Sequence, residues 1–68
     1  MFKPVQSSMI QGISYKKGGE MLVQFRNKTV YKYTGVPPGL HRQLMQAQSK
    51  GKFFLREIRD RYNDERVE

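Results

Sequence analysis

The side chains of this sequence that could take part in binding chemistry are mainly cations. The run SKGK at residues 49–52 places two lysines around a glycine and leads into the aromatic pair FF. Backbone N–H groups at a helix start, with lysines beside them, form a seat for a phosphate group. A helix C-cap at Gly51 followed by a turn explains the glycine equally well. The spacing of a nucleotide-binding P-loop is absent, so this run predicts either a phosphate seat or a helix end.

Positive charge dominates the composition. Thirteen Lys and Arg residues against six Asp and Glu residues give the 68-residue chain a formal net charge of +7. Residues 1–56 hold ten basic side chains and one acidic one, whereas residues 57–68 hold three basic and five acidic ones. A body this basic attracts polyanions, nucleic acid first, although surplus lysines can also serve solubility alone. The candidate phosphate contacts are Lys16, Lys17, Arg26, Lys28, Lys32, Lys50, Lys52, Arg56 and Arg59.

No combination of side chains indicates catalysis or metal binding. His41 is the only histidine, and the chain has no cysteine. Neither a nucleophile–base pair nor a zinc-type ligand set can be assembled from the remaining residues. We therefore expect a non-enzymatic protein with no catalytic residue, no metal and no cofactor. The lack of cysteine, and of any apolar run near 20 residues, favours a soluble cytoplasmic protein.

Alternation of apolar and polar side chains predicts an antiparallel meander of three strands. Their approximate bounds are residues 9–15, 21–26 and 30–34. The turn at residues 16–19 closes the first hairpin, because paired glycines supply the positive φ angles that tight turns require. Gly12 marks a possible β-bulge in the first strand. Residues 1–8 have no periodicity and are expected to form a flexible lead-in.

Tyr31 and Tyr33 project from one face of the third strand and have two interpretations. Exposed rings would stack on unpaired bases. A two-residue loop between the second and third strands would place Lys32 opposite Val23 and bury the lysine. A three-residue loop instead places Tyr31 opposite Phe25 and Tyr33 opposite Val23. This second register gathers the rings on one face, so we expect both tyrosines in the core.

Two amphipathic helices are predicted after the third strand. The first runs from the prolines at residues 37–38 to about residue 48, and the second runs from about residue 53 to residue 62. The polar tail at residues 63–68 is expected to fray. A sheet with one apolar face needs a cover, so residues 9–62 should form a single α+β domain. In this fold class a three-stranded antiparallel meander is covered on one face by two short C-terminal helices.

Several short motifs together resemble the KTSC domain family. In order they are SS at residues 7–8, ISY at 13–15, LVQF at 22–25, YKY at 31–33, VP at 36–37 and SKGKFF at 49–54. The resemblance covers residues 5–62. Domains of this family occur at the C-terminus of some lysyl-tRNA synthetases and as free-standing bacterial and phage proteins. The resemblance implies RNA binding, and Asn27-Lys28 departs from the Asn-Gly turn of many members without an expected effect on function.

These observations lead to one functional expectation and one alternative. The first is a small basic module that binds RNA, or single-stranded nucleic acid, through phosphate contacts. The alternative is a protein-interaction adaptor or phage-type accessory protein that docks on an acidic partner, and the acidic tail would also allow a homodimer. Membrane attachment is not expected, because neither predicted helix is apolar enough to lie in a bilayer surface.

Overall fold

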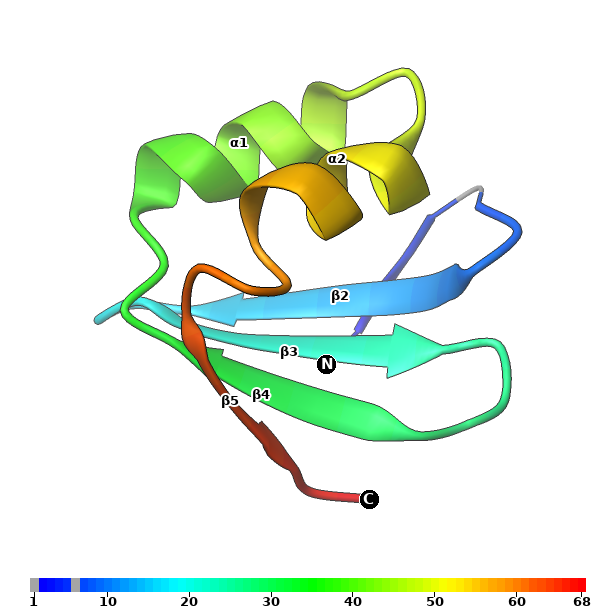
Figure 1. The fold of residues 1–68 in the computed structure, drawn as a ribbon, viewed down its shortest axis with the longest axis horizontal. Coiled ribbons are helices and arrows are strands. Elements are labelled where there is room, and N and C mark those ends of the chain that lie inside the picture. The colour runs from blue at the N-terminus through cyan, green and yellow to red at the C-terminus, as the bar shows by residue number, and fades with distance from the viewer. Residues whose placement is uncertain (1, 6) are drawn as a thin grey trace.

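A computed structural model describes residues 2–5 and 7–68. Its elements are β1 (Lys3–Pro4), β2 (Ile10–Lys16), β3 (Glu20–Phe25), β4 (Val30–Thr34), α1 (Pro38–Gln46), α2 (Lys50–Glu57) and β5 (Asn63–Arg66). The strands form one antiparallel sheet, and both helices lie over the same face of it (Figure 1). The predicted α+β class and the helical cover are therefore confirmed. No helix in the described residues is long and apolar enough to cross a bilayer.

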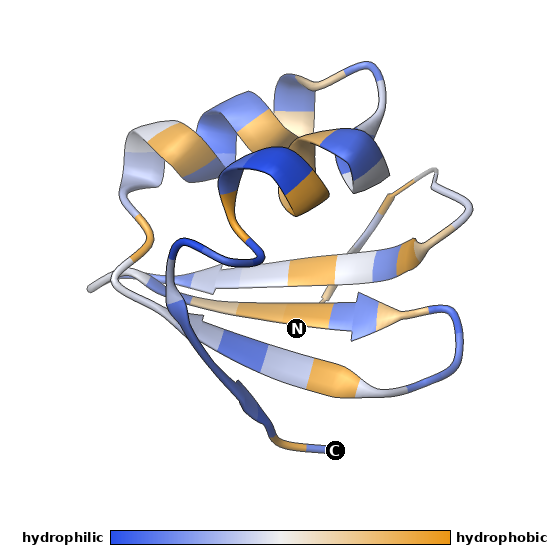
Figure 2. Ribbon diagram, in the orientation of Figure 1, coloured by the Kyte–Doolittle hydropathy of each residue, from blue (hydrophilic) through white to orange (hydrophobic). Residues whose placement is uncertain are grey.

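The sheet is wider than the predicted three-stranded meander. β2, β3 and β4 form that meander, and within the described residues β1 extends it beside β2 and β5 extends it beside β4. β1 lies in the segment that was predicted to be a flexible lead-in, and β5 lies in the segment that was predicted to be a fraying tail. Met1 and Gln6 of the lead-in fall outside the described residues. β5 has no apolar face, as its hydrophilic colouring in Figure 2 shows, and all its side chains are exposed. β5 is held in the sheet by main-chain pairing with β4, and main-chain pairing requires no hydrophobic pattern in the sequence.

β2 contains the bulge that Gly12 suggested. Its pairing with β3 shifts register between Ile10 and Gly12, which leaves one extra residue between them. Because of this shift Ile10 and Ile13 are both buried, although three residues apart would ordinarily mean opposite faces. The turn after β2 contains Gly18 and Gly19 at φ values of 105° and 92°, as predicted.

Residues 26–29 lie between β3 and β4, and the loop closed by the pairing of Phe25 with Thr29 comprises residues 26–28, one residue earlier than predicted. The Phe25 N–H donates to the Thr29 carbonyl at 2.9 Å, which closes the loop. Asn27 holds the turn, because its side-chain oxygen accepts from the Thr29 N–H at 3.1 Å and from the Thr29 hydroxyl at 2.7 Å. Lys28 takes the left-handed conformation, with φ 75°, that glycine would adopt more readily.

The earlier loop changes the register that was predicted for the two strands. Tyr31 lies opposite Val23, and Tyr33 lies opposite Met21. The prediction of Tyr31 opposite Phe25 was therefore wrong by two residues. A shift of two residues preserves the side-chain face, so both tyrosines still point toward the core as expected.

The second helix begins earlier than its apolar stripe suggested. Ser49 is the N-cap of α2, and its hydroxyl accepts from the Lys52 N–H at 3.4 Å. Gly51 therefore lies inside α2, and its assignment as a C-cap of the preceding helix was wrong. Polar residues dominate this first turn, because the cap satisfies backbone donors and the buried stripe starts only at Phe54.

One hydrophobic cluster fills the space between the helices and the sheet. The helical layer contributes Leu44 from α1, Phe54 from α2 and Ile58 just after α2. The Phe54 ring packs edge-on against Tyr33 and Phe25, with centroid distances of 5.3 Å and 5.6 Å. These aromatic contacts attach the middle of α2 to β3 and β4.

Candidate nucleic-acid interface

Cations from two distant segments lie at the end of the molecule where α2 begins. We call this group the basic end: Arg26, Lys28, Lys50 and Lys52. The β3–β4 loop and the start of α2 lie toward the same side in Figure 1. The segment Ser7–Met9 joins them, because Arg26 Nε donates to the Ser7 carbonyl at 3.0 Å. On its other side Ser7 approaches α2 so closely that a methyl group on Gly51 would lie 3.4 Å from the Ser7 hydroxyl.

The charge of the basic end is not compensated by acidic side chains. No carboxylate of the described residues forms an ion pair with any of its four cations. Lys50 donates to the Ala47 carbonyl at 3.1 Å, which holds its ammonium group beside the end of α1. A hollow of about 280 Å³ opens between Ser7–Met9 and α2, and Lys50 and Lys52 line it. An anion in this hollow would therefore meet positive charge and the capped helix start together.

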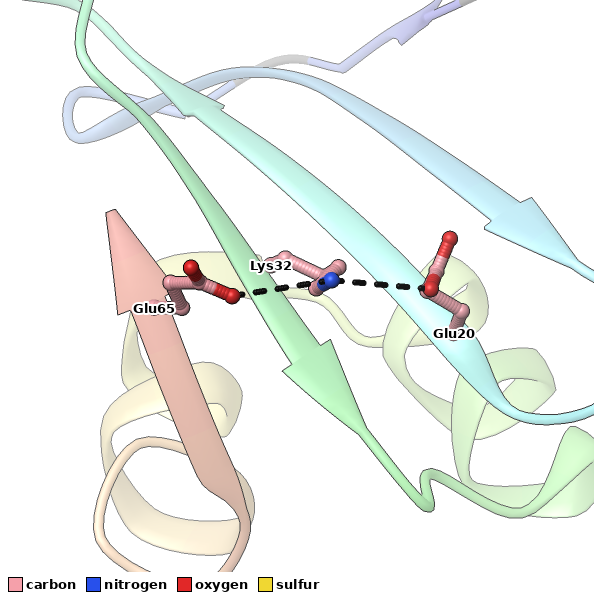
Figure 3. Close-up of polar contacts among 3 residues, drawn as sticks. All are labelled: Glu20, Lys32 and Glu65. Atoms are coloured by element: carbon pink, nitrogen blue, oxygen red, sulfur yellow. Dashed lines mark ion pairs between the residues drawn. The ribbon is translucent and has the colours of Figure 1, made fainter. Parts of the chain in front are cut away.

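The outer face of the sheet, which points away from the helices, has the opposite character. Lys32 on β4 lies between Glu20 of β3, at 3.8 Å, and Glu65 of β5, at 3.6 Å (Figure 3). Two carboxylates around one ammonium group leave a net negative charge at this place. Lys32 was predicted as a phosphate contact, but its charge is compensated by two carboxylates, unlike that of the basic end.

The other four predicted phosphate contacts also lie outside the basic end. Lys16 and Lys17 belong to the β2–β3 turn, which lies at the opposite end of the molecule (Figure 1). Arg56 forms an ion pair with Glu57 at 2.9 Å. Arg59 follows α2 and lines a groove beside the tyrosines. The predicted basic surface thus divides into one uncompensated cluster, one separate turn, two ion-paired side chains (Lys32 and Arg56) and Arg59 at the groove.

A groove of about 410 Å³ lies beside the basic end, between α2 and the strands β3 to β5. We call it the aromatic groove, and its lining residues are Met9, Phe25, Tyr31, Tyr33, Phe54, Leu55, Arg59, Asp60 and Asp64. Leu55 is 42% exposed and gives the groove an apolar wall on the side of α2. Met9 and Leu55 line both this groove and the hollow at the basic end. The two cavities are therefore neighbours along one surface.

Tyr33 and Tyr31 differ in burial within this groove. Tyr33 is only 3% exposed, whereas Tyr31 is half-buried and packs edge-on against Phe25 at 5.8 Å. Burial raises the pKa of Tyr33 to about 12, and the negative charge of Asp64 adds to the shift. The Tyr33 hydroxyl therefore keeps its proton up to a higher pH than an ordinary tyrosine and can act as a hydrogen-bond donor there.

Three parts of this region were not predicted from the sequence. Ser7 was assigned to a lead-in, yet it links Arg26 of the loop to α2. Leu55 carried no signal, because an apolar residue in an amphipathic helix is ordinarily buried. Asp64 and Glu65 were assigned to a fraying tail, and only the pairing of β5 with β4 places them beside Tyr33 and Lys32.

Comparison with known proteins identifies the family of this chain. Residues 6–62 match the KTSC domain, and the chain belongs to this family, as its motifs indicated. The crystal structure of a KTSC domain protein from Yersinia pestis is similar over 100% of this chain and 97% of that chain. The two share 35% sequence identity and superpose with a TM-score of 0.95. No curated protein matches the sequence.

Proposed function

We propose that this protein is an RNA-binding module that holds the phosphates of a single strand at its basic end. The observation that carries the proposal is the gathering of four cations, from two segments far apart in the chain, without a carboxylate partner among the described residues. Regularly spaced phosphates gain affinity from such a cluster by releasing counterions. Membership in the KTSC family supports this proposal, because the resemblance to that family implies RNA binding.

The strand should lie at the basic end rather than across the sheet. Sheets that bind single-stranded RNA usually present aromatic rings on their open face. Here Tyr31 and Tyr33 point to the helical side, and Lys32 on the open face is neutralised by two carboxylates. The lysines and the arginine of the basic end would contact the phosphate backbone of the RNA, and these phosphate contacts do not depend on base sequence.

A salt titration of binding tests this proposal. Fluorescence anisotropy of a short unstructured RNA, of the same sequence as single-stranded DNA, and of duplex DNA is measured at increasing salt. Four phosphate contacts to a single strand predict a slope of about −3 for log affinity against log salt concentration. Absence of binding at low salt, or an affinity that does not change with salt, would refute the proposal.

The segregation of charge also favours a second candidate, an adaptor that docks on an acidic protein. The exposed strand β5 carries Asp64 and Glu65, and a second copy of the chain could present these acids to a basic end. Capture of partners from a lysate before and after nuclease treatment separates the candidates. Loss of every partner after nuclease supports RNA binding, and a protein partner that survives supports the adaptor. Sedimentation of the purified protein tests the homodimer.

A further inference from the structure

The Tyr33 hydroxyl has no partner within the protein although its ring is almost fully buried. No hydrogen bond links this hydroxyl to another described residue, and no side-chain N or O atom of the described residues is buried without a partner. The hydroxyl must therefore reach the aromatic groove that Tyr33 lines. Tyr15 behaves differently, because its hydroxyl donates to the Val36 carbonyl at 2.6 Å. The Tyr33 ring is buried while its hydroxyl lies at the floor of the groove, and an unpaired polar group in a groove is suited to contact a ligand.

The groove combines this hydroxyl with other polar groups and with apolar walls. Arg59 adds hydrogen-bond donors, while Asp60 and Asp64 add acceptors. The half-buried ring of Tyr31 comes from β4, and the exposed side chain of Leu55 comes from α2. A flat ligand with donors and acceptors along one edge would match this lining, and nucleobases have both properties.

We propose that the aromatic groove holds one unpaired nucleobase of the strand whose phosphates lie at the basic end. This inference rests on the proposed function and adds the part of the nucleic acid that enters the fold. Continuity of the surface supports it, because Met9 and Leu55 line both the groove and the basic hollow. A base projecting from a strand bound at Lys52 would thus meet the groove without leaving the surface.

The lining indicates which base fits best. The base would stack on Tyr31 and contact Leu55, which any base can do. The Tyr33 hydroxyl and Arg59 would donate to a carbonyl oxygen, and Asp64 would accept from N–H groups beside it. Guanine presents two N–H groups next to a carbonyl on its Watson–Crick edge, so guanine should bind more tightly than uracil, which presents only one N–H group.

The test uses strands that differ in one base and share every phosphate. The reference strand is a fully abasic ribose-phosphate oligomer, and the probes carry one guanosine or one uridine at the centre. Anisotropy competition should give about tenfold tighter binding for the guanosine strand than for the abasic strand, as one stacked and hydrogen-bonded base would provide. Equal affinity of these two strands would overturn the proposal. Equal affinity of the guanosine and uridine strands would overturn the role of Asp64 as an acceptor.

Two variants connect any base effect to the groove. Tyr33→Phe removes only the hydroxyl, and it should weaken the guanosine strand several-fold while leaving the abasic strand unchanged. Tyr15→Phe is the matched control, because it removes a hydroxyl that serves the fold, and it should leave both affinities unchanged. Equal losses for both strands with Tyr33→Phe, or no loss for either, would place the base elsewhere and overturn the proposal.

The same measurements separate this inference from the proposed function. If neither the abasic nor the guanosine strand binds at low salt, the RNA-binding proposal fails and this inference fails with it. If both bind equally and with a steep salt dependence, phosphate binding at the basic end stands and only the base site is overturned. In NMR spectra, the guanosine strand should shift the ring signals of Tyr31 more than the abasic strand does.

Discussion

The basic end and the outer face of the sheet contain the same kinds of residue in different electrostatic surroundings. At the basic end, Lys28 comes from a loop and Lys52 from a helix start, with no carboxylate of the described residues paired to either. On the outer face, Lys32 is enclosed by Glu20 and Glu65 from the neighbouring strands. Only the first arrangement leaves charge for a polyanion.

The difference shows that a count of lysines is a poor guide to a binding surface. Cross-strand neighbours lie close enough to neutralise a charge, and this pairing depends on which strands are adjacent. Lysines in loops and at helix starts have fewer such neighbours, so no carboxylate offsets their positive charge. The comparison can therefore be tested by altering one region while the other serves as the control.

Reversing charge at the basic end should produce the largest change in binding. Lys28→Glu with Lys52→Glu is expected to lower affinity for single-stranded RNA by about a hundredfold at low salt, roughly tenfold for each contact, and to reduce the salt slope by about 1.4. The matched control is Lys16→Glu with Lys17→Glu, which makes the same charge change in the β2–β3 turn. Equal losses in the two double variants would show that net charge alone drives binding.

Alkaline pH should reveal the buried tyrosine through stability. Tyr33 has a pKa of about 12 in the folded protein, against a usual value of 10.0. Below pH 10 both states keep the proton and the full stabilisation is present. Between pH 10 and 12 the unfolded chain loses the proton first, so the free energy of unfolding should fall, by no more than about 2 kcal/mol at pH 12, because water in the groove screens part of the effect.

Urea unfolding across this range measures the effect. Tyr33→Phe is the control, because it retains the ring but has no proton to lose, and subtraction of its curve removes the contribution of the other titrating groups. A wild-type curve parallel to that of the variant would mean that Tyr33 is not desolvated.

Lys28 offers a test in which stability and binding change in opposite directions. Its φ of 75° disfavours any side chain, so Lys28→Gly should raise the free energy of unfolding by about 0.5 to 1 kcal/mol. The same variant removes one cation of the basic end and should weaken RNA binding. Thermal unfolding and anisotropy on one preparation give both values. A destabilised Lys28→Gly protein would contradict the left-handed loop conformation.

The smallest change is expected on the outer face. Glu20→Gln with Glu65→Gln frees Lys32 from both carboxylates. Because exposed ion pairs contribute little and Lys32 lies on a different face from the basic end, stability should change by less than about 1 kcal/mol and RNA affinity by less than about threefold. A tenfold gain in affinity would place the outer face within the interface and remove the distinction between the two regions.

Particular residues show how far the fold and the site were predictable. The glycines of the first turn, the bulge at Gly12 and the inward face of Tyr31 and Tyr33 were all predicted, because each follows from local backbone preferences or from the two-residue period of a strand. The loop between β3 and β4 was displaced by one residue. The turn position depends on small differences in energy between placing Lys28 and placing one of its neighbours in the left-handed conformation.

The candidate site was predictable in its residue types and not in its grouping. Lys50 and Lys52 were singled out from their spacing around Gly51. Arg26 was grouped with them only by charge, and nothing in the sequence placed it near them, because the link passes through the backbone carbonyl of Ser7. Contacts made by the main chain do not depend on residue type, so they leave no pattern to find.

The amino-acid sequence alone determined the family, the α+β class and the excess of positive charge in the first 56 residues. These properties depend on composition and on short-range periodicity, which are visible along one dimension. The tertiary structure decided which cations remain uncompensated, how β5 neutralises Lys32 and where the Tyr33 hydroxyl emerges. Each of these depends on distances between residues far apart in the chain, and electrostatic and hydrogen-bond energies are set by those distances.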